Sequence, residues 1–569
     1  MLTQSIRRHT LALLLAATLP LLLSAQATKP DVSPAQPLNL PVVAPIVDCS
    51  ALLSVDISEA VGAPTRVTSA TVVNEGTTAP YCKVMGQIDA RLRFEARYPL
   101  AWTQRLIFSP GLFQLPALNV DKFALTFAQD MGNRRHEDIF GENYQARIDY
   151  GYRGLHVVIL ASKALAAKFY NQGPKYTYYH ACSEPGREGM MDVQRFPEDF
   201  NGIVAGCALL DTTANNTFYN GWNLLKNTGA DGNPIITVDK LPILHKAVLD
   251  QCDAADGVKD GLISDPMACH PDLSVVECKL GQSPDSCLTA EQIHVAKEIY
   301  QGAHDAQGGK LVPSGPLPGS ELSWEGPIVN SPKRKDNWEE LELGTTLALR
   351  YLFYDPNPPA TLKLSDLKFD RATFEATTKL HSLYDATDPD LRTFAKNGSK
   401  MILWHGLADT QVSPLNSISY FNAMQKLMGS DAVDKFARLY LFPGTYHCGG
   451  GGVMNRDLLT PLMAWVERGI APGVVIASRI PASAPGSMAN GGSTPAPDLT
   501  RPIYPYPYTT VYAGKGDIND AANFVKGPAR PYTAAELNWF GAGFYAPKYE
   551  KWCTATGTTF NCKDSRDIK

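Results

Sequence analysis

Eleven cysteines in a chain of 569 residues limit the folds open to it, because each disulfide forces two segments to lie side by side. Disulfides persist in exported proteins and are rare in the cytosol. Cys49 and Cys82 flank an early segment, and Cys182, Cys207 and Cys448 have no near neighbour. Short spacings suggest three local pairs, which are Cys252 with Cys269, Cys278 with Cys287, and Cys553 with Cys562. Spacing alone does not fix the pairing, and an odd count leaves one thiol over.

The N-terminus has the layout of a secretory signal peptide. The pair Arg7-Arg8 precedes an apolar run from Leu11 to Leu23, which ends at the small-residue site Ala25-Gln26-Ala27. We expect residues 1–27 to be removed, so that the mature protein is secreted or periplasmic. Residues 28–48 are rich in proline and predict a flexible lead. No other stretch has the length of a membrane span.

Composition excludes one class of partner. With 44% hydrophobic and 19% charged residues and a formal net charge of −5, the chain is an ordinary globular protein without the basic surface that nucleic acid requires. Its length exceeds what one simple core supports. We therefore expect two domains, or one domain with a large insertion, and no nucleic-acid partner.

A serine follows a cysteine in "YTYYHACSEPGREGMM", residues 176–191, between a run that alternates like a strand and one that can open a helix. A nucleophile elbow is such a turn, usually written G-x-S-x-G because small residues let it close. The corresponding positions here are Ala181 and Pro185. Ser183 is therefore either a nucleophile or a serine in an ordinary turn, and this stretch alone favours the second.

Two later segments supply partners in the α/β-hydrolase order of nucleophile, acid and histidine. Residues 401–404 predict a buried strand whose following loop carries Asp409, and residues 439–442 predict a strand whose loop carries His447. An open parallel sheet places its site at the carboxyl ends of its strands. The histidine would take the proton of Ser183, and the aspartate would orient the histidine.

Taken singly, Asp409 is also an ordinary turn residue and His447 an ordinary loop histidine. Cysteine placement couples them, because Cys182 directly precedes the serine and Cys448 directly follows the histidine. A bridge between these cysteines would tie nucleophile to base, and the chain-entropy model assigns about 5 kcal/mol to closing so long a loop. Two separately buried thiols are the alternative.

The segments "ACSEPGREGMMDVQRFPEDFNGIVAG", "MILWHGLADTQVSP", "FPGTYHCGGG", "LTPLMAWVERGIAPGVVIAS" and "GKGDINDAANF" resemble the tannase/feruloyl esterase family, which also includes bacterial mono(2-hydroxyethyl) terephthalate hydrolase. The resemblance covers the chain from about Cys49 to Phe524. It implies an α/β-hydrolase fold with a large inserted lid domain, and ester hydrolysis. It also implies a triad of Ser183, Asp409 and His447 and a Cys182–Cys448 bridge beside it.

Two prolines depart from the family pattern. The family usually reads Cys-Ser-x-Gly-Gly where this chain has Pro185, but proline is tolerated in the first turn of a helix, where its missing N–H would be unpaired. The first oxyanion-hole donor is the N–H of Glu184, which is intact. The resemblance assigns the second to Gly111 in "FSPGLFQLP", where Pro110 replaces another family glycine. We expect the elbow to survive.

A second site is predicted in "CDAADGVKDGLISDPMAC", residues 252–269. Composition alone favours an acidic surface loop. The resemblance reverses that, because five positions match the family's calcium ligands, and calcium prefers carboxylate and carbonyl oxygens. The implied ligands of this structural calcium ion are Asp253, Asp256, Val258, Asp260 and Leu262.

The C-terminal region has lost one cysteine pair and gained another. Tyr504 and Lys526 stand where the family often has cysteines, and we interpret Cys553 and Cys562 as a new local bridge, which leaves Cys207 as the odd, buried thiol. The predicted organisation is a signal peptide (1–27), a lead (28–48), the hydrolase core (49–208 and 393–526), a lid domain with the calcium loop (209–392) and a C-terminal extension (527–569).

The sequence therefore predicts a secreted serine esterase acting on small-molecule esters of aromatic acids, with hydroxycinnamates slightly ahead of gallates. Between Ser323 and Tyr384 it offers aromatic rings that could stack on a planar acyl group, although core packing explains most of them equally well. These rings are Trp324, Trp338, Tyr351, Phe353 and Tyr354. The alternatives are a terephthalate-monoester hydrolase and an inactive, calcium-stabilised binding protein. Oligomeric state does not follow from the sequence.

Overall fold

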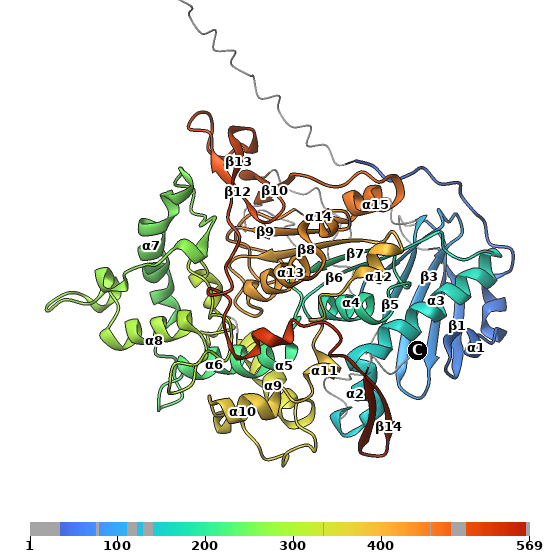
Figure 1. Ribbon diagram of the computed structural model, residues 1–569, viewed down its shortest axis with the longest axis horizontal. Helices are drawn as coiled ribbons and strands as arrows, with labels where there is room; N and C mark the ends of the chain where they lie inside the picture. Colours follow the sequence, from blue (N-terminus) through green and yellow to red (C-terminus); the bar gives the residue numbers. More distant parts are fainter. Residues whose placement is uncertain are drawn as a thin grey trace, which may run out of the picture. The chain divides into compact units, whose positions relative to one another are not determined.

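A nine-stranded sheet forms the centre of the structure, with the strand order β1-β2-β3-β5-β4-β6-β7-β8-β9 (Figure 1). Strands β1, β2, β3 and β5 pair antiparallel, whereas β5, β4, β6, β7, β8 and β9 run parallel. The bounds are β1 Thr65–Val73, β2 Tyr81–Ile88, β3 Leu92–Pro99, β4 Arg105–Phe108, β5 Ala124–Ala128, β6 Tyr176–Cys182, β7 Gly202–Gly206, β8 Lys400–Gly406 and β9 Ala437–Phe442. The strands expected at 401–404 and 439–442 are thus confirmed.

The computed structural model describes residues 35–74, 79–110, 122–128, 140–333, 335–455, 457–479 and 497–564. The expected signal peptide and Gly111 lie outside these ranges. No helix within them is long and apolar enough to cross a bilayer.

Helices cover both faces of the parallel strands. Helices α3 (Gly154–Tyr170), α4 (Glu184–Arg195) and α13 (Pro414–Met428) pack on one face, and α15 (Leu459–Arg468) packs on the other. Successive side chains of β7 alternate between these faces, so its whole sequence, "GIVAG", is buried. A strand covered on both sides reads as a continuous apolar run, which is why β7 has no polar alternation.

A long insertion separates β7 from β8, although the two strands are neighbours in the sheet. It contains α5 Thr212–Ala214, α6 Asn220–Lys226, α7 Leu241–Cys252, α8 Ala290–Gln301, α9 Lys335–Tyr351, α10 Arg371–Thr377, α11 His381–Tyr384 and α12 Arg392–Lys396 (Figure 1). Its buried side chains Leu352, Phe353 and Tyr384 belong to the same apolar cluster as the core helices. The insertion is therefore continuous with the core in its packing.

Short elements complete the structure. Helices α1 Ser58–Val61, α2 Tyr144–Ile148 and α14 Ser430–Val433 lie outside the insertion, and three two-stranded sheets follow α15. These sheets pair β10 Val475–Arg479 with β11 Leu499–Ile503, β12 Tyr508–Tyr512 with β13 Phe524–Ala529, and β14 Lys551–Thr556 with β15 Thr559–Asp564.

The proline-rich lead is held along the core where the structure describes it, at residues 35–48. The N–H of Leu38 donates to Glu467 on α15, and Val43 exchanges two backbone hydrogen bonds with Trp102. The proline-rich composition predicted a flexible tether here. The amides of Leu38, Val43 and Ile46 donate to partners far away in the sequence, so this part of the lead is an ordered strap.

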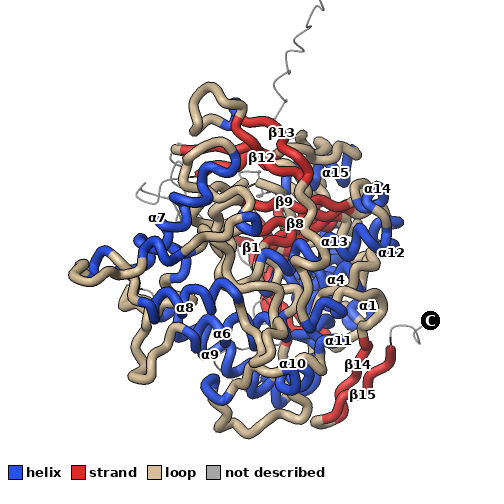
Figure 2. The backbone as a smooth tube through the Cα atoms, turned by 60° about the vertical axis from the view of Figure 1, so that its left-hand side comes forward, coloured by secondary structure: helices blue, strands red, loops and turns tan. Residues whose placement is uncertain are grey.

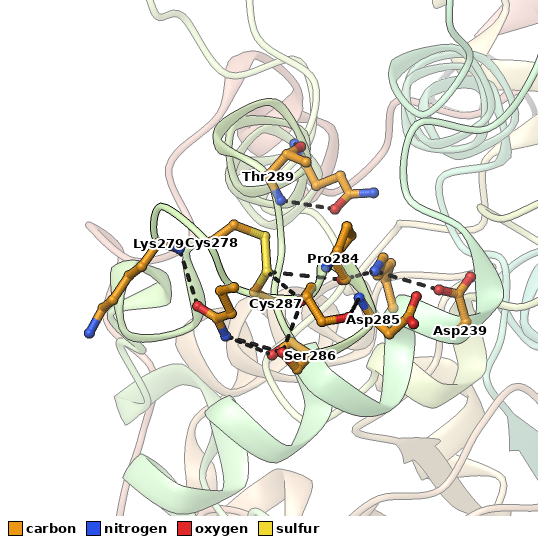
Figure 3. The surroundings of a disulfide bond; sticks show 12 residues. Asp239, Cys278, Lys279, Pro284, Asp285, Ser286, Cys287 and Thr289 are labelled. Atoms are coloured by element: carbon orange, nitrogen blue, oxygen red, sulfur yellow. Dashed lines mark hydrogen bonds and ion pairs between the residues drawn. A yellow bond between two sulfur atoms is a disulfide. The ribbon is translucent and has the colours of Figure 1, made fainter.

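Five disulfides are formed, and they join the pairs that the sequence suggested. They are Cys49–Cys82, Cys182–Cys448, Cys252–Cys269, Cys278–Cys287 and Cys553–Cys562, and Cys207 is a buried free thiol. Figure 3 shows the Cys278–Cys287 loop of the insertion, which leads into α8 at Thr289. The side chain of Lys240 reaches across to the carbonyl of Pro284 in this loop. The bridge thus closes a small loop next to the start of a helix.

The C-terminal extension contains the hairpin β14–β15 (Figure 2). Cys553 pairs directly with Cys562 across it. Tyr152 anchors it, because its hydroxyl donates to the carbonyl of Cys553 at 3.0 Å and accepts from the N–H of the same residue at 2.9 Å. Glu550, directly before the hairpin, is 6% exposed. Burial raises the pKa of Glu550 to about 7, and the nearby Arg195 offsets only part of that effect.

Replacing Glu550 with glutamine should stabilise the protein at pH 8 but have little effect at pH 5. A carboxyl with a raised pKa binds its proton more tightly in the folded state, so wild-type stability falls as the pH rises from about 4.5 to about 7. Thermal unfolding of the wild type and Glu550→Gln at the two pH values measures the difference. Glu198→Gln, at an exposed position, is the matched control, and an equal shift at both pH values would contradict the assignment.

Candidate active site

Ser183, Asp409 and His447 meet at the carboxyl edge of the parallel strands, where they follow β6, β8 and β9 respectively. Nε2 of His447 lies 2.8 Å from Oγ of Ser183, and Nδ1 of the same ring lies 2.8 Å from Oδ2 of Asp409. This chain of hydrogen bonds runs from hydroxyl to imidazole to carboxylate. It has the geometry of a nucleophile, a base and an orienting acid.

Ser183 occupies the sharp turn between β6 and α4, with φ 68° and ψ −135°. A non-glycine residue in such a region costs about 1–3 kcal/mol and persists only where the surroundings enforce it. Here the N–H of Ser183 donates to the carbonyl of Gly206 on β7 at 2.9 Å. Pro185 lies in the first turn of α4, as expected. The turn lies close to β7 at Gly186. A Cβ atom added to Gly186 would lie only 3.0 Å from the carbonyl oxygen of Gly206.

Arg187, fully buried on α4, fixes the start of this helix. Its guanidinium forms an ion pair with Glu184 at 2.6 Å and donates to the carbonyls of Tyr150, Gly151 and Tyr384. These carbonyls come from the helical segment before α3 and from the insertion. One side chain therefore ties the elbow helix to two other parts of the fold.

The carboxylate of Asp409 is fully buried and fully engaged. Its Oδ1 accepts from the backbone N–H groups of Gln411 and Val412, and its Oδ2 faces His447 and also Nε2 of His405, at 3.3 Å. Burial would raise the pKa of Asp409, but the charge of His447 and the hydrogen bonds from both histidines outweigh it and hold the pKa below its usual range. The contacts of Asp409 therefore favour its anionic form.

The N–H of Glu184 is the first donor expected for an oxyanion. The backbone N–H of Glu184 opens α4 directly after Ser183, and it makes no hydrogen bond to any described residue. Helix N-termini favour negative charge, which suits a developing oxyanion. Gly111, the other expected donor, lies outside the described residues.

Cys207 follows β7 and lies beside the acid. Burial raises the pKa of its thiol strongly, and the charge of Asp409 raises it further. Its sulfur, a carboxylate oxygen of Asp409 and a ring nitrogen of His447 all lie within 4.8 Å of one another. The Cys182–Cys448 disulfide runs alongside, with its Cα atoms 6.0 Å apart.

The expected calcium loop gathers its three aspartates in the insertion. Asp260 forms an ion pair with Arg501, whereas neither Asp253 nor Asp256 has a cationic partner among the described residues. Burial raises the pKa of both of these, and the charge of Asp260 raises it further. Val258, another expected ligand, has a buried side chain, as does Leu262.

The carboxylates of Asp253 and Asp256 carry uncompensated negative charge on oxygen atoms, which are the ligands that calcium prefers. However, within the described part of the chain the three carboxylates do not bring one oxygen each within 4.8 Å of the others. A bound ion would have to draw the loop together.

The aromatic rings considered for substrate stacking are mainly packing residues. Trp324 and Phe353 are completely buried, and Tyr351 is 7% exposed. Trp338 and Tyr354 are half-buried against a small apolar cluster of the insertion. The explanation by core packing therefore accounts for at least the first three.

Sequence reasoning missed three residues around the triad. His405 carries a weak signal, because it stands four residues before Asp409 in "WHGLAD" at the end of a buried strand. Arg187 carries none, since its partners are carbonyls of distant segments. Cys207 was identified only as the unpaired cysteine, because its distance from the acid depends on how neighbouring strands align.

Comparison with known proteins identifies the family of this chain. A model of the family described as tannase and feruloyl esterase matches residues 82–526. The chain belongs to the tannase and feruloyl esterase family. It is therefore a carboxylic ester hydrolase.

Relatives in this family match most of the chain. A probable feruloyl esterase B-1 of Aspergillus flavus is 30% identical, with 80% of this chain and 86% of that protein aligned. The mono(2-hydroxyethyl) terephthalate hydrolase of Piscinibacter sakaiensis is 29% identical, with 78% of this chain and 84% of that protein aligned. A crystal structure of an esterase from Aspergillus oryzae is similar, with a TM-score of 0.69, 25% identity and coverage of 84% of this chain and 100% of that one. The predicted α/β-hydrolase fold is confirmed.

Replacing both Cys182 and Cys448 with serine should lower the free energy of unfolding by about 5 kcal/mol, because the bridge closes a loop of 266 residues. It should also lower ester turnover, since the loop of His447 loses its covalent tie to Ser183. Denaturant unfolding and hydrolysis rates measure the two effects.

The double replacement of Cys553 and Cys562 is the matched control, because that bridge spans 9 residues in the C-terminal hairpin. It should cost about 2.5 kcal/mol and leave turnover unchanged. Equal losses of turnover in the two double variants would contradict the link between the Cys182–Cys448 bridge and the site.

Proposed function

We propose that this protein is an exported serine esterase that hydrolyses esters of aromatic acids through an acyl-enzyme intermediate. The observation that carries the proposal is the hydrogen-bonded chain of Ser183, His447 and Asp409, with the serine held at positive φ in a strand-to-helix turn. A serine in an ordinary turn does not need that strained backbone. A histidine satisfied in a loop does not need a serine on one nitrogen and a buried carboxylate on the other.

The reaction follows from these contacts. Nε2 of His447 takes the proton of Ser183 as Oγ attacks the ester carbonyl, and Asp409 stabilises the resulting imidazolium. The oxyanion accepts a hydrogen bond from the N–H of Glu184. His447 then donates its proton to the leaving alcohol, and a water activated by the same ring hydrolyses the acyl-Ser183 ester. Asp409 remains an anion throughout.

The choice of acid is assigned to the insertion, which we propose to act as a lid over this edge of the sheet. The triad and the oxyanion donor treat all acyl groups alike, so discrimination requires other residues. The insertion touches the acid loop directly, because Ser323 donates to the carbonyl of Ala408 at 2.9 Å and Asn215 donates to that of Gln411. The names of the relatives favour a phenolic acyl group, with hydroxycinnamates ahead of gallates.

Export is supported by two features of the chain. The N-terminal sequence has a signal-peptide layout, and ten of the eleven cysteines are joined in disulfides, which persist in oxidising compartments.

A structural calcium ion in the insertion is supported by the uncompensated carboxylates of Asp253 and Asp256. Asp260 and the carbonyls of Val258 and Leu262 would complete its ligands, and no chemical step involves it.

Aromatic esters should be the better substrates. Methyl ferulate and methyl gallate should give higher kcat/KM than methyl butyrate in a hydrolysis panel, and Ser183→Ala should lose turnover about a thousand-fold or more without loss of stability. Asn215→Ala removes a hydrogen bond between the insertion and the loop of Asp409, and it should change the ratio of the two aromatic substrates if the insertion selects the acid. Higher kcat/KM for the aliphatic ester would contradict the aromatic assignment, and a preference for a terephthalate monoester would support the alternative hydrolase.

Calcium should stabilise the protein. An ion bound only by the folded state adds about 2.7 kcal/mol at a hundred times its Kd, so chelation should lower the melting temperature of the wild type. Asp256→Asn should abolish the response to calcium, whereas Asp285→Asn, at an exposed position of the same insertion, should keep it. A wild-type melting curve that does not change with chelator would support an acidic loop without an ion.

A further inference from the structure

Cys207 is the one cysteine outside a disulfide, and all eleven cysteines lie in described segments. Its side chain is completely buried at the end of β7, and its backbone N–H is fixed on the carbonyl of Trp404 at 2.8 Å. The thiol is thereby held in the narrow space beside Asp409 and His447, with one ligand atom of each residue within 4.8 Å of the others. Nothing in ester hydrolysis requires a thiol at this point.

We propose that Cys207, Asp409 and His447 form a binding site for a thiophilic divalent cation of the zinc class. Thiolate, imidazole and carboxylate are the ligands that zinc takes, and a tetrahedral zinc ion with three protein ligands keeps one position for water. Ligand atoms around such an ion are separated by about 3 to 4 Å. To reach that geometry, the ion must replace the hydrogen bond between Nδ1 of His447 and Asp409. Calcium and magnesium prefer oxygen ligands, so these three side chains should bind them poorly.

The nitrogen that faces the site is Nδ1, because it lies 2.8 Å from Asp409 while Nε2 lies 2.8 Å from Ser183. An ion on Nδ1 displaces the proton held there, and it also displaces the proton of the Cys207 thiol. A neutral imidazole with a metal on Nδ1 carries its proton on Nε2. Nε2 then donates to Ser183 instead of accepting its proton.

Zinc binding therefore removes the base from the triad without covering the serine. Inhibition should lower kcat more than it raises KM. This consequence rests on the proposed function, whereas the binding site itself does not. Binding should be slow, because the thiol is fully buried and the ion must enter past the partly exposed His447.

A second group of ligating side chains serves as an internal control. His156, Asp192 and Asp199 also bring one ligand atom each within 4.8 Å of the others, on α3, on α4 and in the loop before β7. This group has no thiol and shares no residue with the triad. Cation binding there would survive replacement of Cys207 and would be removed by Asp192→Asn.

Cobalt(II) reports thiolate binding without any measurement of activity, because a cobalt–thiolate bond produces charge-transfer absorption. The full chain is titrated with cobalt in the presence of excess calcium, as the wild type and as Ser183→Ala, Asp192→Asn and Cys207→Ser. We expect the charge-transfer band at one equivalent in the first three and its absence in Cys207→Ser. A wild type without the band, or a Cys207→Ser variant that retains it, would overturn the site.

Zinc inhibition is then measured on the ester that the enzyme turns over best, with each rate referred to the same variant without zinc. Half-inhibition of Cys207→Ser and of Cys207→Ala should need about ten-fold more zinc or beyond, whereas Asp192→Asn should match the wild type. Equal zinc sensitivity in the wild type and the Cys207 variants would overturn the proposal. A wild type that shows the cobalt band yet is not inhibited by zinc would leave the site standing and count against His447 as the base.

Discussion

The disulfide between Cys182 and Cys448 is the constraint on which the rest of the site depends. Strands β7 and β8 lie between β6, which Cys182 ends, and β9, whose loop carries Cys448. The loop after β9 must therefore cross the ends of two strands to bring His447 to Ser183, and a single hydrogen bond of 2.8 Å offsets little of the entropy of fixing such a loop. The disulfide fixes the loop. The carbonyl of Thr445 in this loop then accepts a hydrogen bond from the N–H of Ala408 at 3.0 Å, which holds the loop of Asp409 in place.

The elbow shows how an unusual sequence can still give the required turn. Strain at Ser183 has to be held by its surroundings, and here it is held by the Gly206 carbonyl on β7 and by the buried guanidinium of Arg187 on α4. Proline in place of the family's glycine costs no hydrogen bond, because an amide in the first turn of a helix has no intrahelical acceptor. A glycine is needed one position later, because α4 lies close to β7 there, and this chain has Gly186 at that position.

Local patterns were sufficient to predict the three strands that precede the triad candidates, which are β6, β8 and β9, and chain order gave the sequence of those candidates. Residues 401–404 and 439–442 are apolar runs followed by polar loops, and such runs depend on neighbours in the sequence. Features that depend on distant partners were not predicted. The order of the lead at 35–48 depends on an acceptor on α15, which nothing near it in the sequence indicates. The contact of Cys207 with Asp409 depends on the alignment of β7 with β8, which the sequence does not show either. The calcium ligands stay a prediction.

The insertion is hydrogen-bonded to both sides of Asp409, the acid of the proposed triad. Thr410, next to Asp409, donates to the carbonyl of Ser323, while Ser323 donates to the carbonyl of Ala408 on the other side of the acid. A third contact joins Asn215 to Gln411, so both flanks of Asp409 are hydrogen-bonded to the segment assigned the choice of substrate. A substitution that repacks this segment therefore shifts the acid and, through it, the imidazole. Changes of specificity in this protein should alter kcat as well as KM, because substrate cover and proton transfer share these hydrogen bonds.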